Sequence, residues 1–165
     1  MKKERMNNKG FSLVELIIVV AIMAVLIVVL APQYLKYVEK SRNATDVTNA
    51  VEIVTAIQVY AADPDAATAL AAGDYTVTVN GTNTTISGDA GFATITTALD
   101  AAGFDVDTTA NTMKTTAVSR TAWTEYAINV TVEATGNVTF DYTAGPGATA
   151  ADAFKNAMAG KKATP

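Results

Sequence analysis

A single carboxylate interrupts the most apolar segment of this chain. Glu15 follows Lys9-Gly10-Phe11-Ser12-Leu13-Val14, and residues 16–31 are all apolar. A charged side chain at the centre of a membrane-spanning helix costs about 2.5–3.5 kcal/mol, so such a residue is expected to have a partner and a function. Glu15 therefore predicts an ion pair, and its positive partner must come from elsewhere.

The chain offers little else for catalysis. It has no His and no Cys, which removes the commonest general base, the commonest metal ligand, and all thiol or disulfide chemistry. Asp100, Asp105 and Asp107 lie close enough in sequence to contribute to a Ca²⁺ site. Acidic loop residues are usually only solvated, so these three are weak metal candidates. We predict no enzyme, no cofactor and no small-molecule substrate.

The charge is unevenly distributed along the chain. The formal net charge is −4, yet residues 1–10 hold four basic side chains and one acidic one. Without that segment the chain keeps 8 of its 12 basic and 15 of its 16 acidic side chains, a net charge of −7. An acidic protein does not attract nucleic acid by its bulk charge, so we expect no nucleic-acid partner.

The segment from Phe11 to Ala31 has the length of a membrane span. Its 21 residues would form a helix of about 30 Å, the thickness of the hydrocarbon core. The basic flank favours a cytoplasmic N-terminus. A secretory signal is a second interpretation, but no small-x-small cleavage site precedes Pro32. Neither a plain anchor nor a signal peptide explains Glu15.

A third interpretation does explain it. The run Lys9-Gly10-Phe11-Ser12-Leu13-Val14-Glu15 resembles the prepilin signature of type IV pilins and type II secretion pseudopilins. The likeness continues through residues 16–22 and through Ala31-Pro32-Gln33-Tyr34, and it covers about the first 42 residues without a gap. The combination is specific: it joins a basic leader, a Gly-Phe junction, a glutamate four residues after the Phe, and a proline at the end of the apolar run.

The resemblance implies a processing step and an assembly step. A prepilin peptidase would cut between Gly10 and Phe11 on the cytoplasmic side and N-methylate Phe11. Gly10 has no side chain, so a protease can approach its backbone closely. In this family the carboxylate of the glutamate pairs with the N-terminal amine of a neighbouring subunit. That amine would be the partner of Glu15, since a buried charge is tolerated when it is paired.

The helix is predicted to continue beyond the membrane. Residues 33–62 contain no Gly or Pro, and Asp63-Pro64 supplies a stop because the residue before a proline is disfavoured in a helix. Apolar residues recur there at spacings of three and four, which predicts one face laid on the rest of the chain. These positions are Tyr34, Tyr37, Val38, Ala44, Val47, Val51, Val54, Ile57 and Ala61. Pro32 lacks an N–H and predicts a kink.

The remainder reads as a small antiparallel β-sheet head. Residues 75–79 alternate at period two before an Asn80-Gly81 turn, and residues 126–132 do so before a Gly136-Asn137 turn. Return strands are expected at 84–86 and 138–142. Short helices are expected from Phe92 to before Gly103 and over 148–159. The fold class is therefore α+β, a helical spine from Phe11 to about Ala62, kinked near Pro32, packed on the sheet.

The expected organisation has four parts. They are a leader (1–10), a membrane-spanning and filament-core helix (11–31), its amphipathic continuation (32–62) and a globular head (63–165). The resemblance implies a structural subunit that forms a homopolymer, held first in the cell membrane and then in an extracellular pilus. Its partners would be other pilin subunits, the prepilin peptidase and the assembly machinery.

Alternatives remain open at this point. One is a pseudopilin of a type II secretion or competence (DNA-uptake) system, although a DNA-uptake role would favour a basic head. Another, from a different class, is a membrane-tethered surface binding module. Many Gram-negative pilins close a C-terminal loop with a disulfide, and the lack of Cys departs from that pattern and suggests a Gram-positive or anaerobic source.

Overall fold

The computed structural model describes residues 10–63, 65–66, 68–145 and 148–160. The first nine residues of the predicted leader lie outside this range. The chain divides into two compact units, residues 1–38 and residues 39–165, and each is described by itself. One helix, α1 (Leu13–Ala62), belongs partly to each unit.

The first unit is the N-terminal part of α1. Its apolar side chains are exposed, as are those of all residues from Gly10 to Tyr37. By length and composition α1 is the one helix, among the described residues, that could cross a membrane. Pro32 lies inside α1, which is helical on both sides of it. The kink at Pro32 stays a prediction.

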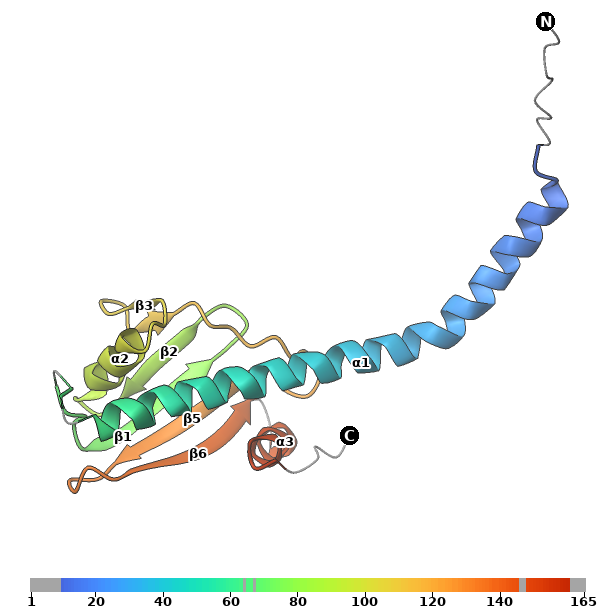
Figure 1. The fold of residues 1–165 in the computed structure, drawn as a ribbon. Coiled ribbons are helices and arrows are strands. Elements are labelled where there is room, and N and C mark those ends of the chain that lie inside the picture. The colour runs from blue at the N-terminus through green and yellow to red at the C-terminus, as the bar shows by residue number, and fades with distance from the viewer. Residues whose placement is uncertain (1–9, 64, 67, 146–147, 161–165) are drawn as a thin grey trace, which may run out of the picture. The chain divides into compact units, whose positions relative to one another are not determined.

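The second unit is built on a six-stranded sheet in which every pairing is antiparallel (Figure 1). The order is β3-β4-β2-β1-β5-β6. The strands are β1 (Gly73–Val79), β2 (Thr84–Gly88), β3 (Val106–Asp107), β4 (Thr112–Met113), β5 (Glu125–Val132) and β6 (Val138–Gly145). The long helix and antiparallel sheet confirm the predicted α+β, pilin-like arrangement.

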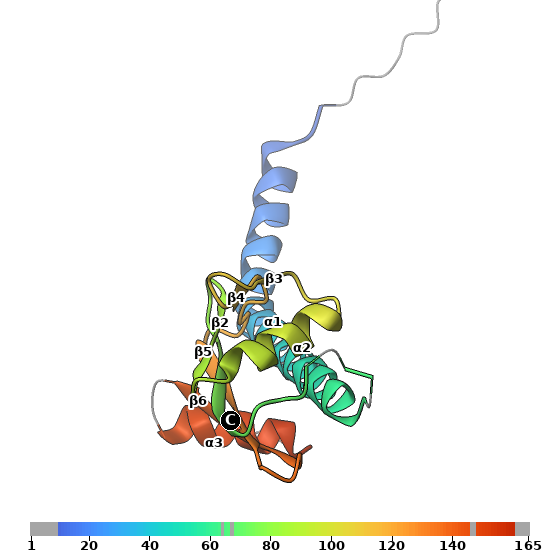
Figure 2. The same cartoon turned by 90° about the vertical axis from the view of Figure 1, so that its left-hand side faces the viewer.

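Two short helices complete the second unit. Helix α2 (Phe92–Ala101) is followed by Gly103, whose φ of +89° lets Gly103 N–H and Phe104 N–H bond back to the carbonyls of Asp100 and Leu99, the Schellman pattern. Figure 2 shows α1 and α2 beside each other on the same side of the sheet, while α3 (Ala148–Met158) lies next to β6. All four expected strands and both short helices are confirmed. The two-residue strands β3 and β4 were not predicted.

The core lies between the sheet and one face of α1. Period-two alternation turns Tyr75, Val77 and Val79 of β1 towards α1, where they are buried. From α1 the buried side chains are Asp46, Ala50, Ile53, Val54 and Ile57. The predicted apolar face is therefore only partly right, because Ala44, Val51 and Ala61 are exposed. Small and β-branched residues lie on both faces of this helix, so apolar spacing alone placed its buried face wrongly.

Candidate functional site

The predicted cleavage junction lies in exposed chain before α1. Gly10 and Phe11 are not helical, and the Phe11 side chain is 94% exposed. No atom lies within 4 Å of the point where a side chain on Gly10 would begin. A protease must bind its substrate in extended form around the scissile bond, so the Gly10–Phe11 peptide bond is open to such an enzyme in this unit.

Glu15 closes the first turn of α1. Its Oε2 accepts a hydrogen bond from the Ser12 backbone N–H at 2.8 Å, and the Ser12 Oγ accepts one from the Val14 N–H at 3.3 Å. This is a capping-box arrangement, in which the N-cap and the third helical residue satisfy orphan N–H groups. The Glu15 carboxylate is thus bonded to the backbone of Ser12, the residue that follows Phe11. Cleavage would create the new amine at Phe11.

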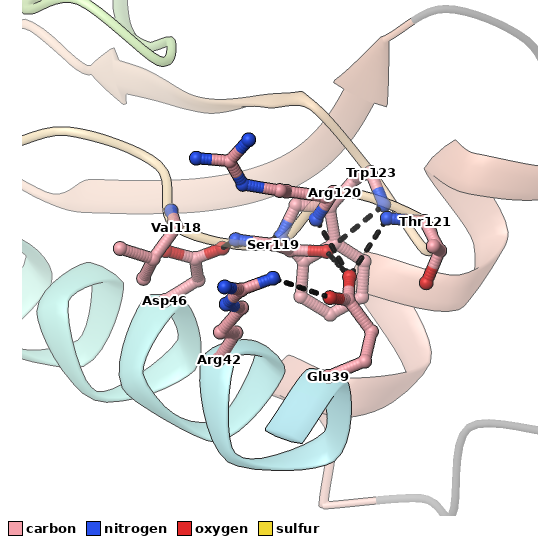
Figure 3. Close-up of polar contacts among 8 residues, drawn as sticks. All are labelled: Glu39, Arg42, Asp46, Val118, Ser119, Arg120, Thr121 and Trp123. Carbon is pink, nitrogen blue, oxygen red and sulfur yellow. Dashed lines mark hydrogen bonds and ion pairs between the residues drawn. The ribbon is translucent and has the colours of Figure 1, made fainter. Parts of the chain in front are cut away.

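A pair of carboxylates that was not predicted from the sequence lies in the second unit (Figure 3). Glu39 and Asp46 are seven residues apart on α1, about two helical turns, so they share one face. Both point at residues 118–123, within the loop that joins β4 to β5. Together they accept the backbone N–H groups of four successive loop residues. We call Glu39, Asp46 and residues 118–123 the acid clamp.

Asp46 is the buried member of the acid clamp. Its carboxylate has no exposed surface, yet it accepts hydrogen bonds from Val118 N–H at 2.8 Å, Ser119 N–H at 2.9 Å and the Trp123 indole Nε1–H at 2.9 Å. A buried charge is destabilising unless it is well hydrogen-bonded. Three donors meet that requirement and fix both the loop backbone and the Trp123 ring against α1.

Glu39 holds the next stretch of the same loop. Its Oε1 accepts Arg120 N–H at 2.6 Å, Thr121 N–H at 2.7 Å and the Ser119 hydroxyl at 2.9 Å. The Arg42 guanidinium lies 3.5 Å from its Oε2. Partial burial raises the pKa of Glu39, but the hydrogen bonds from Arg120, Thr121 and Ser119 outweigh burial and lower the pKa from 4.5 to about 2. Glu39 is therefore a carboxylate at neutral pH.

The aromatic side chains next to the acid clamp join it to α3. Trp123 meets Phe154 edge-on with ring centroids 5.1 Å apart, and Tyr126 stacks on the other side with a centroid distance of 4.5 Å. All three rings are at most 2% exposed. Such pairs add about 0.5–1.5 kcal/mol beyond the burial of their area. The loop, the start of β5 and α3 are thus one packed cluster beside Asp46.

Two of the three weak metal candidates make contacts within the chain. Asp105 pairs with Lys114, and Asp107 accepts the backbone N–H groups of Thr109 and Ala110 at 2.9 and 3.0 Å. Asp100 lies on the exposed side of α2. Within the described residues, no group of three or more His, Cys, Asp or Glu side chains could hold a metal ion. An open polar hollow of about 240 Å³ lies beside Asp105 and Asp107.

Comparison with known proteins gives one match. Residues 5–31 match the family model described as the prokaryotic N-terminal methylation motif, which is the leader of type IV pilins and pseudopilins. The prepilin resemblance is thereby confirmed. The match covers Gly10, Phe11, Glu15 and the apolar segment, and it ends before the second unit. No curated protein and no solved structure matches the chain.

The motif and the helix have consequences for the class of protein. They support a type IV pilin or pseudopilin-like precursor, a structural rather than a catalytic protein. They fit membrane anchoring, and the leader implies processing by prepilin peptidase and assembly into a pilus-like polymer.

Proposed function

We propose that this chain is the structural subunit of a type IV pilus. It is inserted in the membrane as a prepilin, cut after Gly10, N-methylated at Phe11 and polymerised through the N-terminal part of α1. The leader motif at residues 5–31 carries the proposal. The exposed apolar side chains of α1 support it, because a surface of that kind needs lipid or another apolar helix to cover it.

The position of Glu15 supports the assembly step. Glu15 is exposed at the start of α1, and its carboxylate is bonded to the backbone of Ser12, next to Phe11. A cationic amine within hydrogen-bond distance would form an ion pair with this carboxylate, whose present donor, the Ser12 N–H, carries no charge. In the apolar interior of a filament this pairing offsets the cost of burying the carboxylate. An incoming subunit is then favoured because it completes an ion pair.

The same leader also occurs in pseudopilins, so a pseudopilin of a secretion or competence system is the second candidate. The acidic charge of the chain without its leader disfavours direct contact with DNA. The subunit of a pilus should be abundant in filaments sheared from intact cells. A pseudopilin should stay in the cell envelope, and its deletion should block secretion or DNA uptake.

Intact-mass spectrometry of the protein from its native host tests the processing step. We expect a mature chain that begins at methylated Phe11. A chain that retains residues 1–10 in the native host would contradict the pilin and pseudopilin proposals together. It would favour a membrane-tethered surface module instead. Electron microscopy and mass spectrometry of the sheared fraction then separate pilus from pseudopilus.

A further inference from the structure

A band of tyrosine and lysine side chains follows the apolar segment of α1. Tyr34 and Tyr37 are 68% and 71% exposed, and Lys36 and Lys40 are exposed as well. We call these four residues the interface belt, which spans about 9 Å along the helix. Tyrosine is enriched where a membrane-spanning helix passes from hydrocarbon to water, because its ring is apolar and its hydroxyl is polar. In a membrane crossed by α1, the interface belt therefore lies at the level of the lipid headgroups.

The two lysines of the interface belt are not neutralised by the chain. Among the described residues, neither Lys36 nor Lys40 is part of an ion pair. The nearest acid in the sequence is Glu39, but its Oε1 accepts three hydrogen bonds from the loop of the acid clamp, and its Oε2 lies 3.5 Å from the Arg42 guanidinium (Figure 3). Both lysine charges are therefore available to a partner outside the chain.

The charges on the two sides of the apolar segment support a partner of this kind. Residues 1–10 hold four basic side chains, and residues 36–42 hold three. The side of a membrane helix that faces away from the cytoplasm is usually poor in Lys and Arg. Cleavage after Gly10, as proposed, would remove the four basic side chains of the leader and leave those of residues 36–42. Lysines that remain on that side point to an anionic partner there.

We propose that the interface belt binds the anionic headgroups of phospholipids in the membrane leaflet that faces away from the cytoplasm. This inference rests on the membrane insertion that is part of the proposed function, and it requires neither cleavage nor a filament. The partner has to combine an apolar layer, which covers the tyrosine rings, with a negative layer next to it, which pairs with the lysines. The headgroup boundary of an anionic bilayer has both layers.

The length of the lysine side chain and the charge of the rest of the chain fit this partner. A lysine keeps its aliphatic stem on apolar surface while its ammonium group reaches the polar layer, so Lys36 and Lys40 can both reach headgroup phosphates. Residues 46–165 hold 5 basic and 13 acidic side chains, a net charge of −8. An anionic bilayer repels a segment of that charge. The attraction is therefore confined to the interface belt, and anionic lipid sets the depth at which the unassembled subunit is held.

The composition of the lipid next to the interface belt tests this inference. The chain has no native Cys, so Gln33→Cys, at an exposed position one turn before Lys36, carries the only thiol-linked fluorophore. The labelled full-length chain is reconstituted in vesicles of equal parts phosphatidylglycerol and phosphatidylcholine, with bromine on the acyl chains of one lipid or the other. Bromine quenches at short range, so the ratio of the two quenching efficiencies measures which lipid lies beside the label.

Two double variants separate the interface belt from bulk charge. Lys36→Gln/Lys40→Gln removes the two lysines of the belt. Lys114→Gln/Lys155→Gln is the matched control, since it removes two exposed lysines of the second unit that are held in ion pairs. Both double variants change the net charge by the same amount. High salt is a further condition, because it screens exposed charges.

We expect brominated phosphatidylglycerol to quench more strongly than brominated phosphatidylcholine, with a preference of up to about fivefold for each lysine. The preference should disappear in Lys36→Gln/Lys40→Gln and in high salt, and it should persist in the control variant. Equal quenching by the two lipids, or an unchanged preference without the belt lysines, would overturn the inference and leave the proposed function intact. Loss of the preference in the control variant as well would assign it to bulk charge and overturn the inference too. A chain that neither lipid quenches is not inserted, which would contradict the proposed function itself.

Discussion

Glu39 and Asp46 lie two turns apart on α1 and between them accept the N–H groups of Val118, Ser119, Arg120 and Thr121 (Figure 3). Four consecutive amides of one loop are thus satisfied by side chains of a helix more than 70 residues earlier in the sequence. A loop of that kind has no strand ladder of its own to satisfy its backbone. The acid clamp therefore fixes the conformation of the loop that leads into β5.

Asp46→Ala should strongly destabilise the second unit. The change leaves the buried donors Ser119 N–H and Trp123 Nε1–H without an acceptor, at about 1–3 kcal/mol for each unsatisfied group. We expect the free energy of unfolding to fall by about 3 kcal/mol or more. Trp123 is the only tryptophan, so its fluorescence during urea unfolding in detergent reports on this site directly. Asp141→Ala, which removes an exposed ion pair to Lys155, is the control and should cost under about 1 kcal/mol. Equal losses in the two variants would show that Asp46 has no special role.

The stability of the second unit should fall in acid through Glu39. The pKa of Glu39 is lowered from 4.5 to about 2 in the folded chain, so its stabilisation is present above pH 4.5 and is lost as the pH falls towards 2. Glu39→Gln should remove about 2 kcal/mol at pH 7, and progressively less below about pH 4.5. Unfolding curves of both proteins between pH 7 and pH 2 measure this. Curves that stay parallel over the whole range would contradict the role given to the Glu39 charge.

Glu15→Ala should separate processing from assembly. The scissile bond and Gly10 are unchanged, so cleavage and methylation at Phe11 should continue. The filament yield should fall steeply because the amine of a neighbouring subunit loses its partner. Intact mass gives the state of the N-terminus, and electron microscopy of sheared filaments gives the yield. Glu133→Ala, an exposed glutamate of the second unit, should assemble normally. Normal filaments from Glu15→Ala would mean that the ion-pair argument is wrong.

Phe154→Ala should loosen α3 and the aromatic cluster. Phe154 is fully buried between Trp123 and Tyr126, and truncation of a buried Phe costs about 3–5 kcal/mol. Phe154→Leu keeps most of the volume and should cost clearly less. Unfolding followed by Trp123 fluorescence compares the two. Equal losses of stability in the two variants would show that Phe154 does not stabilise the cluster through the volume of its side chain.

The elements that sequence predicted were those with a local signal. Three of these signals act within a few residues: the alternation in residues 75–79 and 126–132, the Asn80-Gly81 turn, and Gly103. Each predicted an element that the structure shows. β3 and β4 have two residues each and carry no period to detect. They form because Met113 and Thr112 meet β2 and β3 in the folded chain. Long-range pairing of this kind has no short-range signature.

The functional features divide in the same way. The leader motif is local, so Gly10, Phe11 and Glu15 could be named from the sequence. The capping box of Ser12 with Glu15 was not predicted, although its Ser-x-x-Glu pattern is equally local. The acid clamp could not be named, because its donors are backbone amides that have no identity in a sequence. A partial signal existed, since Glu39, Asp46, Ala50, Ile53 and Ile57 follow one helical face. Acids on a core-facing stripe indicate buried partners.

The short strand at one edge of the sheet has a consequence for crowding. A strand at the edge of a sheet offers unpaired N–H and C=O groups to any similar strand nearby, and proteins blunt such edges with very short strands. Here the edge opposite β6 ends in β3, which has two residues. That edge therefore offers little backbone for pairing with the sheet of another copy. Copies that assemble through the N-terminal helix, as proposed, would keep their sheets separate at this edge even at high local concentration.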